Sequence, residues 1–324
     1  MKKFFIMGMA AMGLALTACN NDETVEVAKG NAIGFNTFVN NSTRATDTDN
    51  TNFKSFKVWG LMNNGTQTGT PFVGIDVTKG ADGAWSYTTP VYWEKGYAYS
   101  FVALAPNDAY TFTAPSVINT WGSLTFENKT GETDLLYATQ KNEGVTAGTC
   151  PAPVELTFNH MLSRVRFQFK NGMLDGSKLT VTGVKITDAY TNGTATLAEN
   201  LANLTWEATG TGDLAFSNAT DTKIIKDATC TTGHKYMIPA KKAYNVTFTV
   251  TREYNGVTDS YNHNVTLPAT TMTQGLSYQF VAEFTSKNID PDNELCPITF
   301  TAEVKGWENF TDNNFALPNK PNNN

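Results

Sequence analysis

The chain is poor in the residues that build most catalytic and metal sites. Its 324 residues include only three histidines and four cysteines, and arginine occurs only at positions 44, 164, 166 and 252. Acidic residues outnumber Lys and Arg by 30 to 24, so the formal net charge of −6 provides no field that would attract a polyanion. We therefore expect no nucleic-acid partner.

Catalytic and cofactor motifs are also missing. The sequence contains no G-x-S-x-G, Walker, dinucleotide-binding or H-E-x-x-H pattern. His160, His234 and His263 lie far apart, and none has a second histidine three or four residues away that would support a metal site. Asp290 and Asp292 lie in a linker-like stretch, where solvated acids need no catalytic role. We predict that the protein is not an enzyme and uses no metal or cofactor.

Strand-forming and turn-forming residues dominate instead. The chain has 49 threonines and 33 asparagines; Thr is stiff at χ1 and Asn competes for backbone hydrogen bonds, so both disfavour helices. Apolar and polar residues alternate in segments 33–37, 154–158, 165–169, 246–250 and 298–304. Turn signals lie at Asn63-Asn64-Gly65, Ala81-Asp82-Gly83, Asn171-Gly172, Asn192-Gly193 and Asn255-Gly256. We predict an all-β fold of antiparallel sheets, with helix confined to short pieces near 134–141 and 197–204.

The chain opens with a signal sequence. Lys2 and Lys3 precede an apolar run at residues 4–16, which is too short to span the roughly 30 Å hydrocarbon core of a bilayer. The run ends in Leu16-Thr17-Ala18-Cys19, which resembles the lipobox of bacterial lipoproteins. We predict that residues 1–18 are removed and that Cys19 is lipidated, so that acyl chains hold the exported protein at the outer membrane. The alternative is an ordinary signal with a chance cysteine.

Three further cysteines, Cys150, Cys230 and Cys296, remain in the exported chain. This odd number allows one disulfide, and the spacing does not say which pair would form it. The spacing also matches no zinc pattern, so buried or unpaired thiols are the simpler interpretation.

Loop-like composition divides the chain into segments. Residues 44–52 are rich in Thr, Asp and Asn, residues 142–153 contain Gly and two prolines, and residues 286–297 contain two prolines among polar residues. We predict a propeptide with the first strand at 19–44, β-sandwich domains at 45–153 and 154–286, and a linker with a C-terminal strand at 287–324. Both ends of the chain would then carry a detached strand.

Many aromatic residues gather between positions 59 and 101, and they are Trp59, Trp85, Tyr87, Tyr92, Trp93, Tyr97, Tyr99 and Phe101. Exposed, they would form a platform for sugar rings. However, they fall at alternating strand positions, and large aromatics between two sheets commonly produce this pattern. We predict that they form a core.

Several short motifs follow one another in a characteristic order. They are lipobox Cys19, the strand at 33–39, Arg44-Ala45, Phe56-Lys57-Val58-Trp59-Gly60, Gly83-Ala84-Trp85-Ser86-Tyr87, Val91-Tyr92-Trp93, Phe101-Val102-Ala103-Leu104-Ala105-Pro106, Asp134-Leu135-Leu136, Leu156-Thr157-Phe158-Asn159-His160-Met161-Leu162-Ser163 and Trp307. This order resembles the fimbrillin family, the type V pilus subunits of Bacteroidales, over essentially the whole chain. The resemblance implies two transthyretin-like antiparallel β-sandwich domains in tandem and a structural subunit of an adhesive surface fibre, most simply a stalk subunit.

The resemblance also implies a processing step. Family members are exported as lipoproteins, trimmed by an Arg-specific protease after the first strand, and joined by strand exchange. Here the cut would fall between Arg44 and Ala45 and would remove the strand that carries Ile33, Phe35 and Val39. The residues themselves agree, because Arg44 is the only arginine in a loop-like segment, where proteases cut most easily. The alternative is an arginine in an ordinary exposed linker.

A C-terminal segment repeats the pattern of the first strand. Ile298, Phe300, Ala302 and Val304 occur at the same alternating spacing as Ile33, Phe35, Thr37 and Val39. In the family a C-terminal strand of this kind, ending near a Trp such as Trp307, is the donor that refills the groove of the next subunit. The alternative is that residues 298–304 form an edge strand of their own domain.

The expected partners follow from this interpretation. They are other copies of the chain or related pilus subunits, an Arg-specific protease, the outer membrane before trimming, and a ligand on a host or bacterial surface. The alternative function is a surface-exposed glycan-binding or adhesin lipoprotein, a tip or anchor subunit that does not polymerise. An enzyme ranks below both.

Overall fold

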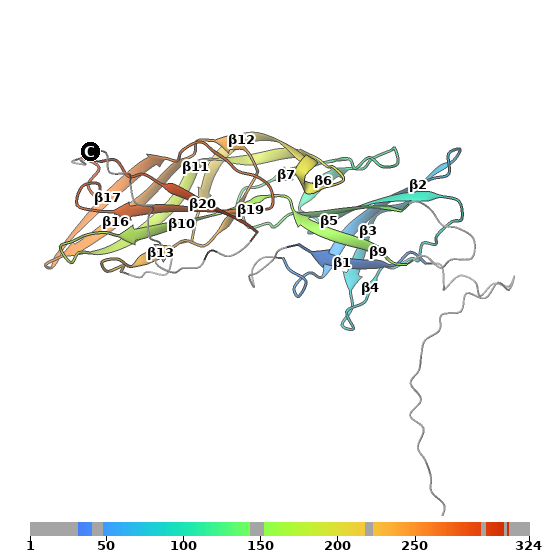
Figure 1. Cartoon of the computed structure of the whole chain (residues 1–324), viewed down its shortest axis with the longest axis horizontal. Helices are drawn as coiled ribbons and strands as arrows, with labels where there is room; N and C mark the ends of the chain where they lie inside the picture. The colour runs from blue at the N-terminus through green and yellow to red at the C-terminus, as the bar shows by residue number, and fades with distance from the viewer. Residues whose placement is uncertain are drawn as a thin grey trace, which may run out of the picture.

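A computed structural model describes residues 32–40, 48–142, 152–217, 223–292, 296–307 and 310. In this part of the chain the regular structure consists of strands and one short 3-10 helix, η2 (Leu201–Asn203). The strands build an elongated molecule, in which one half follows the other along the long axis (Figure 1). The prediction of an all-β fold is confirmed.

The N-terminal half is built on a seven-stranded sheet with the order β1-β9-β8-β5-β2-β3-β4. Its strands are β1 (Phe35–Val39), β2 (Ser55–Asn63), β3 (Thr68–Lys79), β4 (Trp85–Ser86), β5 (Ala98–Ala105), β8 (Leu136–Asn142) and β9 (Val154–His160). The sheet curls until its two edge strands, β1 and β4, approach each other. Its concave face thereby encloses a core.

The C-terminal half consists mainly of two sheets, of six and five strands. One has the order β17-β16-β11-β7-β6 with β12 beside β11, and comprises β6 (Tyr110–Thr113), β7 (Ser123–Glu127), β11 (Lys178–Thr196), β12 (Thr205–Ala215), β16 (Asn245–Tyr254) and β17 (Val257–Thr266). The other has the order β13-β10-β19-β20 with β14 beside β10, and comprises β10 (Ser163–Asn171), β13 (Thr229–Thr231), β14 (Lys235–Met237), β19 (Leu276–Phe284) and β20 (Thr301–Gly306). A small fourth sheet pairs β15 (Lys241–Lys242) with β18 (Thr270–Thr271).

The expectation of purely antiparallel sheets is wrong at two places. β1 pairs with β9 in parallel, with Phe35 opposite Val154, and β10 pairs with β19 in parallel, with Arg164 opposite Ser277. Tight turns enforce antiparallel pairing only between strands that follow each other directly. More than a hundred residues separate the partners here, so the turn signals carried no information about their direction.

The sequence placed the domain boundary near residue 153, and the strand pairing bears on its exact position. β9, which was expected to open the second domain, pairs with β8 and β1 of the N-terminal sheet. Conversely, β7 pairs with β11 of the C-terminal half, and β6 pairs with β7. Alternation showed that these segments are strands but not which core they cover. We propose a boundary after His160, with the β6–β7 hairpin reaching across it.

Three groups of buried side chains hold the structure together. The N-terminal core includes Ile33, Phe35, Val39, Phe53, Phe56, Phe72, Phe101, Leu156 and Phe158. The C-terminal core lies between the six-stranded and the five-stranded sheet and includes Val165, Phe167, Phe169, Val250, Phe248, Phe280, Phe284, Ile298 and Phe300. A junction core joins the halves and includes Val102, Leu104, Leu135, Tyr137, Met161, Leu162, Tyr236 and Trp307.

One turn signal was correct and another was misleading. Asn255 and Gly256 both have positive φ, as the tight turn between β16 and β17 requires. Asn192 and Gly193, in contrast, lie inside β11. A Cβ on Gly193 would come within 2.9 Å of the Trp206 ring, so this glycine serves close packing of β12 against β11.

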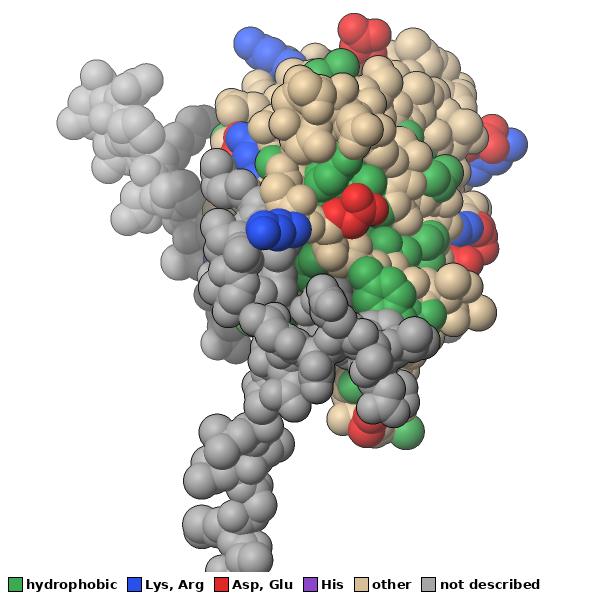
Figure 2. Space-filling model, turned by 90° about the vertical axis from the view of Figure 1, so that its right-hand side faces the viewer, with side chains coloured by type: hydrophobic (Ala, Val, Ile, Leu, Met, Phe, Trp, Pro, Cys, Tyr) green, Lys and Arg blue, Asp and Glu red, His purple; other side chains and the backbone are tan. Residues whose placement is uncertain are grey.

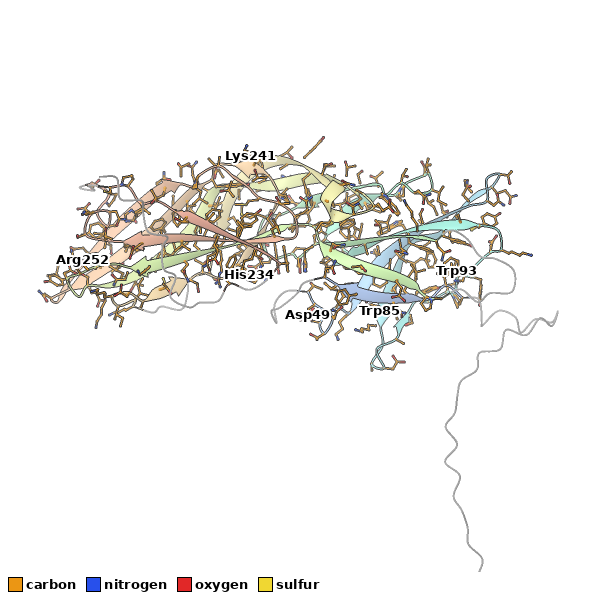
Figure 3. All side chains as sticks on the ribbon, viewed as in Figure 1. Asp49, Trp85, Trp93, His234, Lys241 and Arg252 are labelled. Carbon is orange, nitrogen blue, oxygen red and sulfur yellow. The ribbon has the colours of Figure 1, made fainter. Side chains whose placement is uncertain are left out.

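Most of the aromatic cluster is core, as predicted. Trp93, Tyr99 and Phe101 are buried, and Trp59, Trp85, Tyr87 and Tyr97 are partly buried against the N-terminal or junction core, whereas Tyr92 is 40% exposed. Figure 3 shows Trp85 and Trp93 on the N-terminal half. The short helix expected near 134–141 is instead β8, while η2 lies within the second expected piece. Across the described ranges, no helix has the length and apolarity to cross a membrane.

Candidate functional site

The first strand fills a groove at the edge of the N-terminal sheet. β1 pairs along its length with β9, from Phe35 opposite Val154 to Val39 opposite Phe158. In the strand order of this sheet it has no neighbour on its other side. Ile33, Phe35 and Val39, predicted as the inward face, are all buried. The strand therefore contributes a full row of side chains to the core while only one of its edges belongs to a ladder.

Phe35 makes the most extensive contacts of this strand. Its ring lies edge-on to four other aromatic rings, with centroid distances of 5.5 to 6.1 Å, and they are Phe56, Phe72, Tyr87 and Phe101. Aromatic pairs in this geometry add to the stability gained by burial alone. Loss of the strand would open a large apolar pocket lined by these rings.

Hydrogen bonds hold both ends of the strand. At the start, Ile33 N donates to Val91 O at 2.8 Å, and the Tyr87 hydroxyl donates to Ile33 O at 2.7 Å. At the end, Asn50 Oδ1 accepts from Val39 N at 2.8 Å and Asn50 Nδ2 donates to Val39 O at 3.4 Å. Asn50 belongs to the segment 44–52 that the sequence described as a loop, so this loop also clamps the strand before it.

The C-terminal strand occupies an edge of its own half. β20 pairs antiparallel with β19, from Val281 opposite Thr301 to Leu276 opposite Gly306. Ile298 and Phe300, just before β20, are buried in the C-terminal core, where Phe300 contacts Phe167 at 5.6 Å between ring centroids. The structure therefore has residues 298–306 docked in their own half, which is the arrangement the sequence left open as the alternative.

The inward pattern of this segment is incomplete, however. Ala302 is only partly buried, and Val304 is 47% exposed. Val39, which holds the matching place in the first strand, is 1% exposed. Val304 therefore has no buried contact in its own half comparable to the one that the groove of β1 would offer.

Trp307 directly follows β20, and its ring is buried at the junction between the halves. Its ring stacks on His160 at 4.0 Å between centroids and lies parallel to Tyr236 at 5.8 Å. The Arg164 guanidinium lies 5.4 Å from its centre, and Asp134 Oδ1 bonds His160 Nδ1 at 2.8 Å. We call Asp134, His160, Arg164 and Tyr236 the Trp307 socket. His160 is buried in this socket.

Asp134 connects this socket to the loop that clamps the first strand. Its second oxygen, Oδ2, accepts from Thr48 N at 3.0 Å. Thr48 lies two residues before Asn50, which holds Val39. The end of β1 and the end of β20 are thus joined by one short series of contacts.

Other predicted positions lie outside the described residues or in structural roles. Cys19, Arg44, Ala45 and Cys150 lie outside the described residues. His263 is buried and stacks on Phe248, and His234 lies beside Tyr236. In the part of the chain that the structure describes, no three His, Cys, Asp or Glu side chains gather as a metal site would require.

Cys230 and Cys296 are not joined in a disulfide. Cys296 is exposed, whereas Cys230 in β13 packs against the C-terminal core, and this burial raises the pKa of its thiol to about 11. Because the thiolate is the reactive form, we expect Cys230 to react with iodoacetamide at pH 8 on the order of a hundredfold more slowly than an ordinary exposed thiol. Peptide mass spectrometry after timed labelling would measure this, and equal rates at Cys230 and Cys296 would contradict it.

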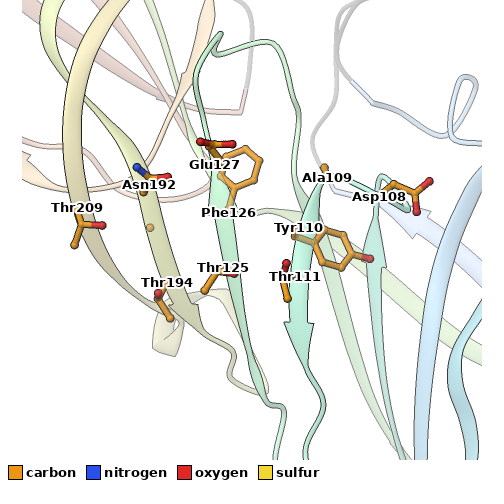
Figure 4. Close-up of a pocket in the computed structure, with 11 residues that line it drawn as sticks. Asp108, Ala109, Tyr110, Thr111, Thr125, Phe126, Glu127, Asn192, Thr194 and Thr209 are labelled. Atoms are coloured by element: carbon orange, nitrogen blue, oxygen red, sulfur yellow. The ribbon is translucent and has the colours of Figure 1, made fainter.

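A hollow on the surface of the β6–β7–β11–β12 face offers little to a sugar ring. Its lining is mostly polar and includes Thr111, Thr125, Thr194, Thr209, Asn192, Asp108 and Glu127 (Figure 4). Of its two aromatics, Phe126 is buried, and Tyr110 is partly buried, which raises the pKa of its hydroxyl. Glycan platforms present open aromatic faces, so this hollow does not favour a glycan-binding function.

Among the described residues, the end of the N-terminal half also carries no concentrated charge. Figure 2 shows hydrophobic side chains over the middle of this face, with acidic and basic side chains scattered around them. A surface of this kind does not offer the positive stripe of a nucleic-acid interface.

Sequence reasoning missed the residues that hold the two strands in place. Asn50, Tyr87 and Asp134 act through contacts between distant segments, and no local spacing marks them. The role of Asn50 was weakly indicated by its residue type, because Asn and Asp in loops readily form hydrogen bonds with nearby backbone groups. Trp307 was noted only as a landmark.

Comparison with known proteins places these features in a family context. The profile of a family described as fimbrillin-like matches residues 43–307. A fimbrial protein from Bacteroides vulgatus superposes with a TM-score of 0.63 at 18% identity, covering 86% of this chain and 99% of that one. A candidate cell adhesion protein from Bacteroides ovatus gives a TM-score of 0.52 at 14% identity, covering 86% and 99%. No curated protein matches the chain.

Proposed function

Because the chain belongs to the fimbrillin-like family, we propose that it is a structural subunit, most simply a stalk subunit, of an adhesive surface pilus. In this proposal the chain is exported as a lipoprotein anchored through Cys19 in the outer membrane. An Arg-specific protease then cuts after Arg44, and the first strand leaves. The C-terminal strand of another copy, or of a related subunit, refills the groove.

The observation that carries the proposal is the mismatch between Val304 and Val39. The segment from Ile298 to Val304 repeats the apolar pattern of Ile33 to Val39, yet Val304 is 47% exposed in its own half while Val39 is 1% exposed in the groove. Moving the strand into the vacated groove would bury the exposed half of Val304, which contributes about half of the roughly 1.5 to 3 kcal/mol gained when a fully exposed valine is buried. Main-chain bonds to β9 would add affinity, as in other cases of β-strand addition.

Binding of one subunit's C-terminal strand in the groove of the next subunit would also produce a filament. The tail of one subunit and the groove of another are different surfaces, so the contact is heterologous and leaves a free tail and a free groove at the two ends. Deletion of residues 298–324 should accordingly prevent elongation, although it also removes Ile298 and Phe300 from the C-terminal core.

Val304→Asp tests the role of the C-terminal strand as a donor without disturbing the part of the segment that is buried in its own half. Because Val304 is exposed beside Tyr278 in the single subunit, we expect the free energy of unfolding to change by about 0.5 kcal/mol or less. In the groove the same carboxylate would take the buried place of Val39 in the N-terminal core, so we expect fibre formation to be lost. Electron microscopy and sedimentation of trimmed protein would measure fibres, and denaturant unfolding would measure stability.

Thr301→Asp is the matched control. Thr301 is exposed in its own half, and in the groove it would take the place of Asn36, which is also exposed. The same charge three residues away should therefore leave polymerisation unchanged. Fibres of normal length from Val304→Asp would overturn the proposed donor strand.

A further inference from the structure

Two strands approach the junction of the molecule from opposite ends. β1 runs parallel to β9 and ends at Val39, opposite Phe158 and close to His160. β20 runs antiparallel to β19 and ends at Gly306, opposite Leu276, beside the start of β10 at Ser163. β9 and β10 lie in the two halves and are joined by two residues, Met161 and Leu162. The ends of both strands therefore meet near this connection (Figure 1).

The register predicts where Trp307 would lie after strand exchange. This step rests on the proposed function, with Ile298 in the place of Ile33 and Val304 in the place of Val39. Lys305 then takes the place of Asn40, which bonds Asn159 across the ladder at 2.8 Å. Trp307, two residues further along, would come opposite Met161, a residue of the junction core that directly follows His160 in the chain.

The direction of the side chain agrees with this position. Residues alternate across the N-terminal sheet, so that Phe101 and Ala103 face the N-terminal core while Val102 and Leu104 face the junction core. Val304 would face the N-terminal core, as Val39 does. Trp307 is an odd number of residues further along, so it would face the junction core, where the Trp307 socket already lies.

We propose that the Trp307 socket of one subunit receives Trp307 of a second copy of this chain in the fibre. Before exchange, the same socket holds the subunit's own Trp307, which arrives along β19. After exchange, the neighbour's Trp307 arrives along β9. The Trp307 socket thus binds the subunit's own indole before exchange. After exchange it recognises the indole of the neighbouring subunit.

The resident contact leaves hydrogen-bonding capacity unused. Trp307 Nε1 and His160 Nε2 are both buried and have no hydrogen-bond partner among the described residues. Buried polar atoms without partners weaken a packed contact. The socket therefore holds the resident indole by stacking and leaves it able to exchange for an equivalent one.

Replacing one Trp307 by another in the socket affects which donor strands the groove accepts. Because an indole is buried in the socket both before and after, the exchange neither gains nor loses this burial as a whole. Trp307 instead fixes the register, since a strand shifted by two residues would fill the groove but leave the socket empty. The socket would thereby reject apolar strands that lack an aromatic residue three positions beyond the last pocket.

Photo-crosslinking tests this directly. The full chain is made with p-benzoylphenylalanine in place of Tyr236, in heavy-isotope and light forms that are mixed in equal amounts before polymerisation. In untrimmed protein we expect crosslinks to the peptide that contains Trp307 within single chains only. In fibres we expect heavy–light crosslinks to be as frequent as crosslinks between chains of the same isotope. The reciprocal probe in place of Trp307 tests the same contact from the strand, should the first variant fail to fold.

Outcomes for the two hypotheses can be told apart. Fibres in which residue 307 is crosslinked only within its own chain would overturn the socket proposal but leave the pilus function intact. Absence of fibres from trimmed wild-type protein would instead contradict the proposed function itself. A probe in place of Tyr254, in the β16–β17 hairpin, is the control and should not capture the Trp307 peptide in either state.

Discussion

Arg44→Ala is expected to abolish fibre formation while the chain remains folded and lipid-anchored. Under the proposed function the cut after Arg44 frees the groove, so an uncut chain keeps β1 and cannot accept a donor. The structure supports the choice of this arginine, because the backbones of the other three lie in ladders. Arg164 and Arg166 are buried in β10, and Arg252 in β16 is paired on both sides. Fibre yield by electron microscopy and chain length by mass spectrometry would measure the effect.

Two controls sharpen this prediction. Arg44→Lys keeps the positive charge but removes the guanidinium, so it should block an Arg-specific protease as completely as alanine. Arg252→Ala removes a partly buried arginine near the far tip of the C-terminal half, where Arg252 pairs with Asp175 at 2.7 Å, and should still yield fibres (Figure 3). Normal fibres from Arg44→Ala would refute the processing site.

Phe35→Ala is expected to lower the free energy of unfolding of the untrimmed chain by about 3 to 5 kcal/mol. The ring is buried among four aromatic rings at the edge of the N-terminal sheet, and alanine would leave a cavity there. Trimmed protein from the same gene should match trimmed wild type, because residue 35 is no longer part of it. Denaturant unfolding in an Arg44→Ala background would give the first value.

Phe38→Ala is the matched control on the same strand. Phe38 faces away from the core and is 54% exposed, so its removal should change the stability of the untrimmed chain by roughly 0.5 kcal/mol. A loss at Phe38 as large as at Phe35 would mean that the strand is held in a different orientation from the one described.

The sequence predicted the strands better than their partners. Alternation predicted strands at 154–158 and 298–304, because burial on one face has a direct period in the chain; the structure has β9 at Val154–His160, whereas β20 begins only at Thr301. It could not assign 154–158 to the N-terminal sheet, since Val154, Leu156 and Phe158 would suit either core. Asn192-Gly193 shows the same limit: a turn and a close contact with Trp206 both call for glycine, and only the fold tells them apart.

The candidate site was predictable to a similar extent. Alternation placed Ile33, Phe35 and Val39 on one face of the first strand, and Ile298 and Phe300 on one face of the C-terminal segment; all five are buried. The exposure of Val304 was not predictable, because the alternation continues past the point where the C-terminal core ends. The clamp by Asn50 and the contact between Asp134 and His160 depend on tertiary proximity between segments that share no sequence signal.

The parallel pairing of β1 with β9 bears on how a fibre would resist mechanical force. A donor strand in this position would lie lengthwise in the molecule, as β9 does, and its two ends would be drawn apart along that same direction (Figure 1). Tension would then load the row of backbone bonds in shear, so that they must fail together, whereas a strand held crosswise would peel away one bond at a time. Flow across a surface would accordingly pull on each joint between subunits in its strongest direction.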